Sequence, residues 1–122
     1  MEIKNQAFEH NSSLKEIIIP NNVTKIGASA FTYCSAMTNV VLGSSVQTIE
    51  GTAFRLCGRI PTLVLPASLE VIGAKAFEYC NTLKDVTFEG KDIATMQGLT
   101  NYPWSLPSGC VIHCTDGDTT LP

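Results

Sequence analysis

The side chains best suited to chemistry in this sequence are five cysteines and two histidines. Cys110, His113 and Cys114 fall in one short segment near the C-terminus and have the side-chain types of a zinc site. In a strand, Cys110 and Cys114 share a face while His113 points to the opposite face. Three such ligands cannot converge on one tetrahedral ion. We therefore predict no metal and no cofactor, but a strand with two inward thiols and an exposed histidine.

The other three cysteines, Cys34, Cys57 and Cys80, are spaced 23 residues apart, and Asn11 occupies the same position in the first copy. Equivalent residues on stacked strands lie about 4.7–4.9 Å apart, a separation that a disulfide could span. However, stacked equivalent side chains point the same way, which disfavours a bridge. We predict reduced structural thiols in an inward column, each S–H (or the Asn11 amide) facing a backbone carbonyl.

Other candidate chemistry is incomplete. Asp116 and Asp118 flank Gly117, but the remaining acidic positions of a calcium loop and its distal glutamate are missing, so we predict a surface turn. Nucleophilic catalysis needs a base beside a serine or cysteine. The two histidines, His10 and His113, are expected at opposite ends of the molecule. The sequence therefore predicts no enzyme.

Composition narrows the class of protein. The chain has 122 residues, of which 44% are hydrophobic and 16% charged, which is typical of a folded domain. A net charge of −3 and scattered basic residues disfavour nucleic acid as a partner. No apolar run approaches the ~20 residues that span a bilayer, so we predict no membrane insertion. The N-terminal sequence shows no signal peptide, and the compartment stays open at this point.

The elements that must position these side chains are repeats. Phenylalanine, preceded by alanine, recurs every 23 residues, and most other columns keep their polarity. The recurring pairs are Ala7-Phe8, Ala30-Phe31, Ala53-Phe54 and Ala76-Phe77. A fixed period over most of a chain is typical of a solenoid. One repeat buries too little apolar surface to offset the entropy of ordering its residues, so stacking on neighbours must supply the difference.

Spacing within a repeat predicts its elements. Alternation around Ile17 and Ile19 predicts a strand, and Pro20 begins a turn. A second short extended segment ends at Ile26 and is closed by glycine. Residues 28–33 are predicted to form a turn or two of helix, because Phe31 and Cys34 are three apart on one face.

The run from Leu14 to Cys34, L-x-x-I-x-I-P-x-x-V-x-x-I-G-x-x-A-F-x-x-C, resembles the BspA-like leucine-rich repeat of bacterial and protist proteins. Residues 60–80 match nearly as well, and the middle copy departs at Gly43 and Glu50. The resemblance covers about residues 1–90. It implies an open, curved leucine-rich-repeat solenoid associated with surface adhesion and protein binding, with no catalytic residues. A location at the cell surface or outside the cell follows from the resemblance alone.

We therefore predict a β-rich, α/β-type repeat solenoid with short strands, small helical turns and a C-terminal cap. The solenoid should occupy residues 1–90, with a partial repeat over 1–13, full repeats over 14–36, 37–59 and 60–82, and the start of the last at 83. Residues 91–122 should form the cap, with Ile93, Met96 and Leu99 on a short helix and "CVIHC" as a terminal strand. This ending, with Trp104 after Tyr102-Pro103, also resembles that of some BspA-like proteins.

What remains for function is the outward strand surface. Its candidate partner-binding residues form one polar and one β-branched column: Glu16, Asn39, Thr62 and Asp85, and beside them Ile18, Val41, Val64 and Thr87. An exposed apolar stripe can mark a partner site, although β-branched residues also suit strands for their own sake. We expect a non-enzymatic binding module for a protein or a glycan, forming the C-terminal part of a longer bacterial surface or secreted protein. The alternative is a structural spacer capping a longer array. The first repeat also predicts continuation upstream or end-to-end self-association.

Overall fold

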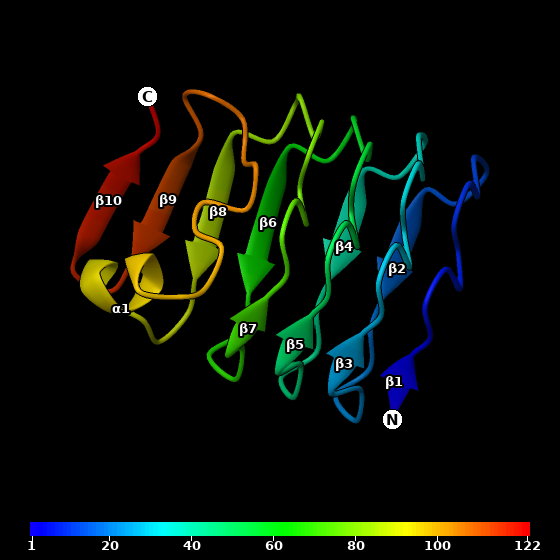
Figure 1. Cartoon of the computed structure of the whole chain (residues 1–122), viewed down its shortest axis with the longest axis horizontal. Coiled ribbons are helices and arrows are strands. Elements are labelled where there is room, and N and C mark those ends of the chain that lie inside the picture. The colour runs from blue at the N-terminus through cyan, green and yellow to red at the C-terminus, as the bar shows by residue number, and fades with distance from the viewer.

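A computed structural model describes the whole chain, Met1–Pro122. Short strands and turns wind into a solenoid whose two termini lie at opposite ends (Figure 1). The elements in chain order are β1 (Glu2–Ile3), β2 (Glu16–Ile18), β3 (Lys25–Ile26), β4 (Asn39–Val41), β5 (Thr48–Ile49), β6 (Thr62–Leu65), β7 (Val71–Ile72), β8 (Asp85–Phe88), α1 (Ile93–Gln97), β9 (Val111–Cys114) and β10 (Gly117–Thr120). The predicted β-rich repeat solenoid is confirmed.

Each 23-residue repeat forms one coil with two strands on different faces. The second strands make one parallel sheet in the order β1-β3-β5-β7. The first strands make two sheets, β2-β4 and β6-β8, and the latter is extended by β9 and β10. Register follows the repeat, because Ile17 lies opposite Val40 and Ile26 opposite Ile49. The period in the sequence is therefore the spacing of the ladder.

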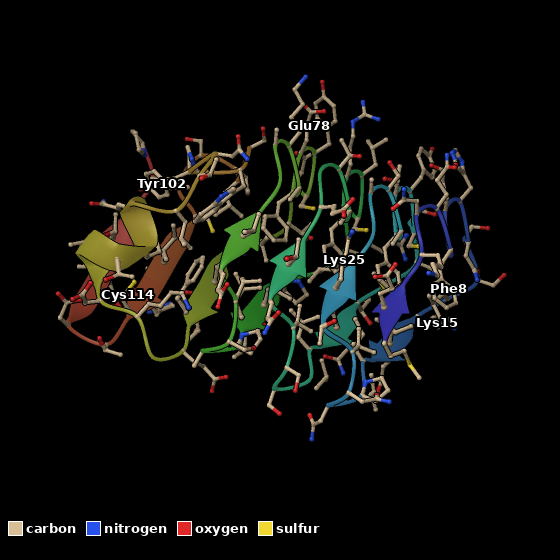
Figure 2. All side chains as sticks on the ribbon, turned by 60° about the horizontal axis from the view of Figure 1, so that its bottom comes forward. Phe8, Lys15, Lys25, Glu78, Tyr102 and Cys114 are labelled. Atoms are coloured by element: carbon tan, nitrogen blue, oxygen red, sulfur yellow. The ribbon has the colours of Figure 1, made fainter.

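The phenylalanine column forms the centre of the core. The rings of Phe8, Phe31, Phe54 and Phe77 stack from coil to coil with centroids 5.2, 5.2 and 5.9 Å apart. Phe31, Phe54 and Phe77 are fully buried, whereas Phe8 is only partly buried. Figure 2 shows the side chains along the whole solenoid, with Phe8 labelled in its first coil. Stacking on both sides thus begins with the second ring.

The segments around the Ala-Phe pairs are not helices, which corrects the prediction for residues 28–33. Ala30 and Thr32 donate N–H bonds of 3.2 Å to the carbonyls three residues before them. Phe31, between them, donates its N–H to Ala53 O in the next coil at 2.8 Å. An α-helix needs every N–H for its own carbonyls, so alternate bonding to a neighbour excludes it. Ser29 has φ 56°, the left-handed conformation that the third residue of a type II turn requires.

Glycine at the end of the second strand is required by the distance between coils. A Cβ on Gly73 would lie 2.2 Å from the backbone nitrogen of Gly51 in the preceding coil, and one on Gly27 would lie 2.6 Å from that of Asn5. The backbones of successive coils therefore approach too closely here for any side chain.

The C-terminal segment completes the last coil. The predicted helix is confirmed for Ile93 and Met96 as α1, but Leu99 lies beyond its end at Gln97. Asp92 accepts the N–H of Thr95 at 2.8 Å, and Met96 is buried. The predicted strand is confirmed as β9, but it is not terminal, because β10 follows and pairs with it as a hairpin. Trp104 is buried against Phe88. The carbonyl of Trp104 accepts the N–H of Phe77 at 3.2 Å. In the preceding coils the equivalent N–H of phenylalanine is accepted by an alanine carbonyl of the next coil. The segment thus covers the last repeat and supplies the backbone acceptor that a further coil would provide.

Candidate binding surface

The outward strand positions lie on one face of the solenoid, formed by β2, β4, β6 and β8 (Figure 1). Side chains alternate along each strand, so Val40 and Leu63 point into the core while their neighbours face outward. In the polar column, Glu16, Asn39 and Thr62 are exposed and Asp85 is half-buried. The register places Glu16 beside Asn39 and Thr62 beside Asp85.

The apolar column beside it is strongly exposed. Ile18, Val41 and Val64 keep 66%, 45% and 50% of their surface accessible. Thr87 is half-buried, and the register continues the column to His113 on β9. Three adjacent β-branched side chains in solvent form a contiguous apolar stripe, which is the kind of surface that partner sites use.

The face is interrupted between β4 and β6, which are not hydrogen-bonded to each other. Elsewhere, the residue just before the strand donates its N–H to the preceding coil: Thr38 to Lys15 O at 2.8 Å, and Lys84 to Pro61 O at 2.9 Å. The equivalent donor between β4 and β6 would be residue 61, which is proline and has no N–H. Pro61 therefore accounts for the loss of the first bond of this ladder.

A hollow of about 220 Å³ lies on the outer face at this break. We call it the strand-face hollow; its lining residues are Asn39, Val40, Val41, Leu42, Thr62 and Val64. Four of the eight predicted partner-binding residues thus line one cavity. Glu16 and Ile18 lie to one side of it on β2, and Asp85 and Thr87 to the other on β8.

A polar cluster at the cap end of the same face was not predicted from the sequence. His113 contacts Asp85 through Nε2 and Asp118 through Nδ1, each at 2.8 Å. Hydrogen bonds to these carboxylates, Asp85 first, raise the pKa of the imidazole. The histidine thus ties β8 to β10 across β9. Its outward direction was predicted, but its partners lie 28 and 5 residues away and only the strand register brings them together.

The other side chains considered for chemistry are buried or make structural contacts. Cys110 is buried and Cys114 half-buried, and no three potential ligand side chains come together as a metal site. Asp116 accepts the N–H of Ile93 at 2.9 Å and so caps α1. His10 lies in the first coil, and its ring stacks on that of Tyr33 in the second coil. None of these groups places a base beside a nucleophile.

The central cysteine column is bonded as predicted. Cys34, Cys57 and Cys80 donate S–H bonds of 3.2, 3.0 and 3.0 Å to the carbonyls of the phenylalanines 26 residues earlier. All five cysteines are free thiols. Burial raises the pKa of Cys80 to about 12 and also raises that of Cys57. Because the thiolate is the nucleophile, these thiols are poorly suited to react at neutral pH.

Asn11 does not follow the cysteine column, which corrects the prediction of an inward amide there. Its side chain is exposed, and its Oδ1 accepts N–H bonds from Ser13 at 3.2 Å and Leu14 at 3.1 Å. An Asx side chain satisfies nearby backbone donors in this way at turns. In the first coil the side chain at this position thus closes a local turn and makes no hydrogen bond between coils.

Known proteins share the repeat described above. The BspA type Leucine rich repeat region matches residues 1–100 in six copies. No match was found among curated proteins. No helix in the structure has the length and apolar character needed to cross a bilayer.

Three solved structures have the same solenoid. A leucine-rich-repeat protein of T. pallidum is 33% identical over 72% of this chain and 41% of its own, with a TM-score of 0.71. One from Bacteroides ovatus is 27% identical over 93% of this chain and 28% of its own, with a TM-score of 0.80. A leucine-rich cell surface protein of Faecalibacterium prausnitzii is 30% identical over 70% of this chain and 26% of its own, with a TM-score of 0.61. The chain spans less than half the length of each.

Proposed function

Because the chain belongs to the BspA-type leucine-rich-repeat family, we propose that it is a non-enzymatic binding module that holds a protein partner on its strand face. The observation that carries the proposal is the strand-face hollow beside the exposed stripe of Ile18, Val41 and Val64. The cell surface is the proposed location, supported by the name of the Faecalibacterium protein that this chain resembles.

An apolar side chain of the partner fits the hollow chemically. Val40, Val41, Leu42 and Val64 supply apolar lining, and such pockets take the anchor residues that dominate protein interfaces. Asn39 and Thr62 add amide and hydroxyl groups at the same cavity, which can bond a partner's backbone. An apolar centre with a polar border is the usual anatomy of a protein interface. A glycan, rich in hydroxyls, gains less from this stripe.

The proposal is tested by selecting short peptides from a random library displayed on phage against the immobilised chain. We expect selected peptides to share an apolar residue and to bind saturably in fluorescence anisotropy. Val64→Asp should weaken that binding about tenfold or more, because it places a charge at the hollow. Ile18→Asp, Val41→Asp and Val64→Asp together should abolish it.

Val71→Asp is the matched control. Val71 is a similarly exposed valine, 46% against 50% for Val64, but it lies on β7 in the other sheet. Equal binding by the parent and Val64→Asp would remove the strand face as the site. If no peptide is enriched, the structural-spacer function that the sequence also allows becomes the better explanation.

A further inference from the structure

A second hollow, of about 440 Å³, crosses the edge of the solenoid formed by the Ala-Phe turns. It shares no residue with the strand-face hollow, and no hydrophobic side chain lines it. We call it the turn-edge groove; its lining residues are Glu9, His10, Ser29, Thr32, Thr52, Arg55, Lys75 and Glu78. Its volume is within the range of roughly 300–1,000 Å³ typical of small-molecule sites.

The groove exists because side-chain size varies from coil to coil at two repeat positions. The position of Ser29 and Thr52 is taken by lysine in the next coil, and the position of Thr32 is taken by Arg55 and then Glu78. Three short hydroxyl side chains therefore lie in the two middle coils, where Arg55 shares a coil with Thr52, and the other charged side chains, Glu9, Lys75 and Glu78, lie in the outer coils. The side chains in these two columns vary between coils, unlike those of the core. Packing of the core therefore does not explain which residues occupy them.

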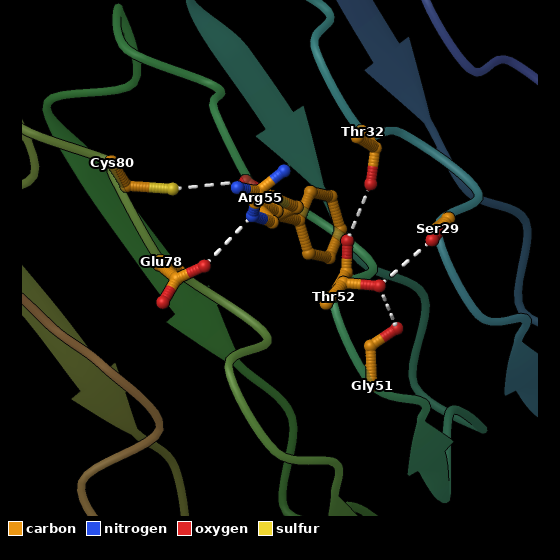
Figure 3. Close-up of polar contacts among 8 residues, drawn as sticks. Ser29, Thr32, Gly51, Thr52, Arg55, Glu78 and Cys80 are labelled. Atoms are coloured by element: carbon orange, nitrogen blue, oxygen red, sulfur yellow. Dashed lines mark hydrogen bonds and ion pairs between the residues drawn. The ribbon is translucent and has the colours of Figure 1, made fainter.

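The hydroxyl groups of the groove are held in a fixed arrangement (Figure 3). Thr52 Oγ1 donates to Gly51 O at 2.7 Å, so its 2.7 Å contact with Ser29 Oγ must be donated by the serine. Thr32 Oγ1 donates to Thr52 O at 2.7 Å. Each of the three hydroxyls has one proton, and each proton is committed within the protein. The free lone pairs of Ser29 and Thr32 thus act as acceptors for a ligand.

Arg55 and Lys75 supply the complementary donors of the groove. Arg55 donates from Nε to Glu78 Oε1 at 2.7 Å, and its guanidinium lies 5.3 Å from the centre of the Tyr79 ring. These two contacts hold the guanidinium in place and leave its terminal N–H groups for a ligand. Lys75 is exposed at the same groove. The Arg55 donor and the hydroxyl acceptors are therefore arranged before any ligand arrives, which lowers the entropic cost of binding.

The charge of the groove selects against ions. Two carboxylates, Glu9 and Glu78, balance Arg55 and Lys75, so the lining has no net charge when His10 is neutral. A phosphate or sulfate would face the carboxylates, and an apolar ligand would leave the polar lining unsatisfied. A ligand hydroxyl, in contrast, both donates and accepts, so neighbouring hydroxyls can donate to Ser29 or Thr32 and accept from Arg55 or Lys75.

We propose that the turn-edge groove binds a neutral saccharide through paired hydroxyl groups. The hydroxyls of Ser29 and Thr32 accept from the sugar, and the guanidinium and ammonium groups donate to it. Tyr33 and Tyr79, exposed by 46% and 51%, lie against two of the lining residues, His10 and Arg55, and so place ring surface beside the groove. The groove runs across successive coils, whose phenylalanine rings in these turns lie 5.2, 5.2 and 5.9 Å apart, so it suits an extended oligosaccharide.

The experiment uses maltopentaose, cellopentaose and mannopentaose as probes, titrated to millimolar concentration into isotopically labelled protein. We expect one of them to shift the backbone amide signals of Ser29, Thr32 and Thr52 saturably. Ser29→Ala should raise the dissociation constant about tenfold, because it removes one hydroxyl acceptor. Thr32→Val should do the same while keeping the shape of the side chain.

Thr82→Val is the matched control, because Thr82 also donates to a backbone carbonyl, that of Gly58 at 2.8 Å, but lies outside the groove. It should bind the saccharide like the parent. Thr32 is buried, so thermal unfolding of each variant is measured, and Ser29→Ala alone decides if Thr32→Val unfolds. The proposal is overturned if no probe gives saturable shifts, if the shifts lie on β4 and β6, or if Ser29→Ala binds unchanged. Equal binding of inorganic phosphate or a Gly-Ser peptide would also overturn it.

Discussion

His113 is the residue whose ionisation has the clearest consequence for this molecule. It has one carboxylate on each ring nitrogen, and a histidine held between two carboxylates has a folded-state pKa above its usual value. Protonated His113 therefore stabilises the folded state, because the unfolded chain loses both contacts. The same residue joins three strands of the strand face and borders the apolar column. Its charge thus affects both stability and the surface that we propose for partner binding.

We predict that stability falls as pH rises through this region. A raised folded-state pKa gives a contribution fully present below the unfolded value of about 6.5 and lost as pH rises through the folded-state pKa. The urea midpoint should therefore decrease from pH 6 towards pH 8 more steeply in the parent than in His113→Gln. Urea unfolding followed by circular dichroism at several pH values measures this difference.

The control for this measurement is His10→Gln, which removes the other histidine and leaves the contacts of His113 intact. The decrease in the urea midpoint that depends on the contacts of His113 should persist in this variant. Identical pH profiles for the parent and His113→Gln would show that the two carboxylate contacts do not persist in solution. Added salt should reduce the difference, because the cluster is half-exposed and its charges are screened.

At the scale of elements, the close approach of successive coils makes some glycines irreplaceable and leaves others free. A Cβ on Gly73 would lie 2.2 Å from Gly51 N, and the atoms it meets belong to backbone that cannot turn aside. Gly58 has no atom within 4 Å of the position its Cβ would take, and neither glycine has a left-handed φ. The two positions therefore separate steric crowding from the general effect of replacing glycine.

We predict that Gly73→Ala destabilises the protein by roughly 1–3 kcal/mol, the usual penalty for forcing atoms into packed structure. Gly58→Ala should change the free energy of unfolding by less than about 1 kcal/mol, and stabilisation is the expected direction because alanine restricts the unfolded chain. Urea unfolding of both variants measures the difference. Equal effects for the two would mean that the coils are farther apart between β5 and β7 than the structure shows.

Elements also show how far the sequence could predict the structure. Strand positions and register followed from the 23-residue columns, because a stacked ladder repeats its inward side chains at the period of the chain. The turns around Phe31 were mistaken for helix because spacing of three residues is common to a helical turn and to successive β-turns. Only the bonding of alternate N–H groups to the next coil distinguishes them, and that bonding leaves no mark on the side-chain pattern.

The candidate sites were less predictable for a related reason. The stripe at Ile18, Val41 and Val64 follows from strand alternation, so the sequence could locate it. The break between β4 and β6 had one signal, proline at residue 61 in a column that otherwise donates an N–H. The turn-edge groove depends on repeat positions whose residue type changes from coil to coil. Such positions show no repeated pattern that could be recognised in the sequence.

For the whole molecule, stability is expected to differ along the solenoid axis. A coil in the middle stacks on two neighbours, and the last coil stacks on the cap. The first coil stacks on one side only in this chain, and its apolar residues Ile3, Phe8, Leu14 and Ile17 are only partly buried. Opening the molecule from this end therefore loses the least buried surface.

We predict that backbone amide exchange is fastest in the first coil. The N–H of Phe8, bonded to Ala30 O at 2.8 Å, should exchange before that of Phe54, bonded to Ala76 O at 2.9 Å, although the two bonds are equivalent in geometry. Hydrogen exchange followed by mass spectrometry or NMR measures this order. Equal protection at both residues in dilute protein would contradict one-sided stacking. Protection of Phe8 that increases with protein concentration would support the end-to-end self-association expected from the sequence.

The sulfur bonds have a consequence for the length of such a molecule. Each thiol donates to the phenylalanine carbonyl one coil earlier, so the bond is defined by neighbouring units and not by their number. Excision of residues 37–59, one full period, would bring Cys80 opposite Phe31 with the same donor and acceptor. Whole units can therefore be added or removed without leaving a polar group unmatched inside. The same excision would remove Thr52 and Arg55, so changes in copy number alter the exterior while the interior persists.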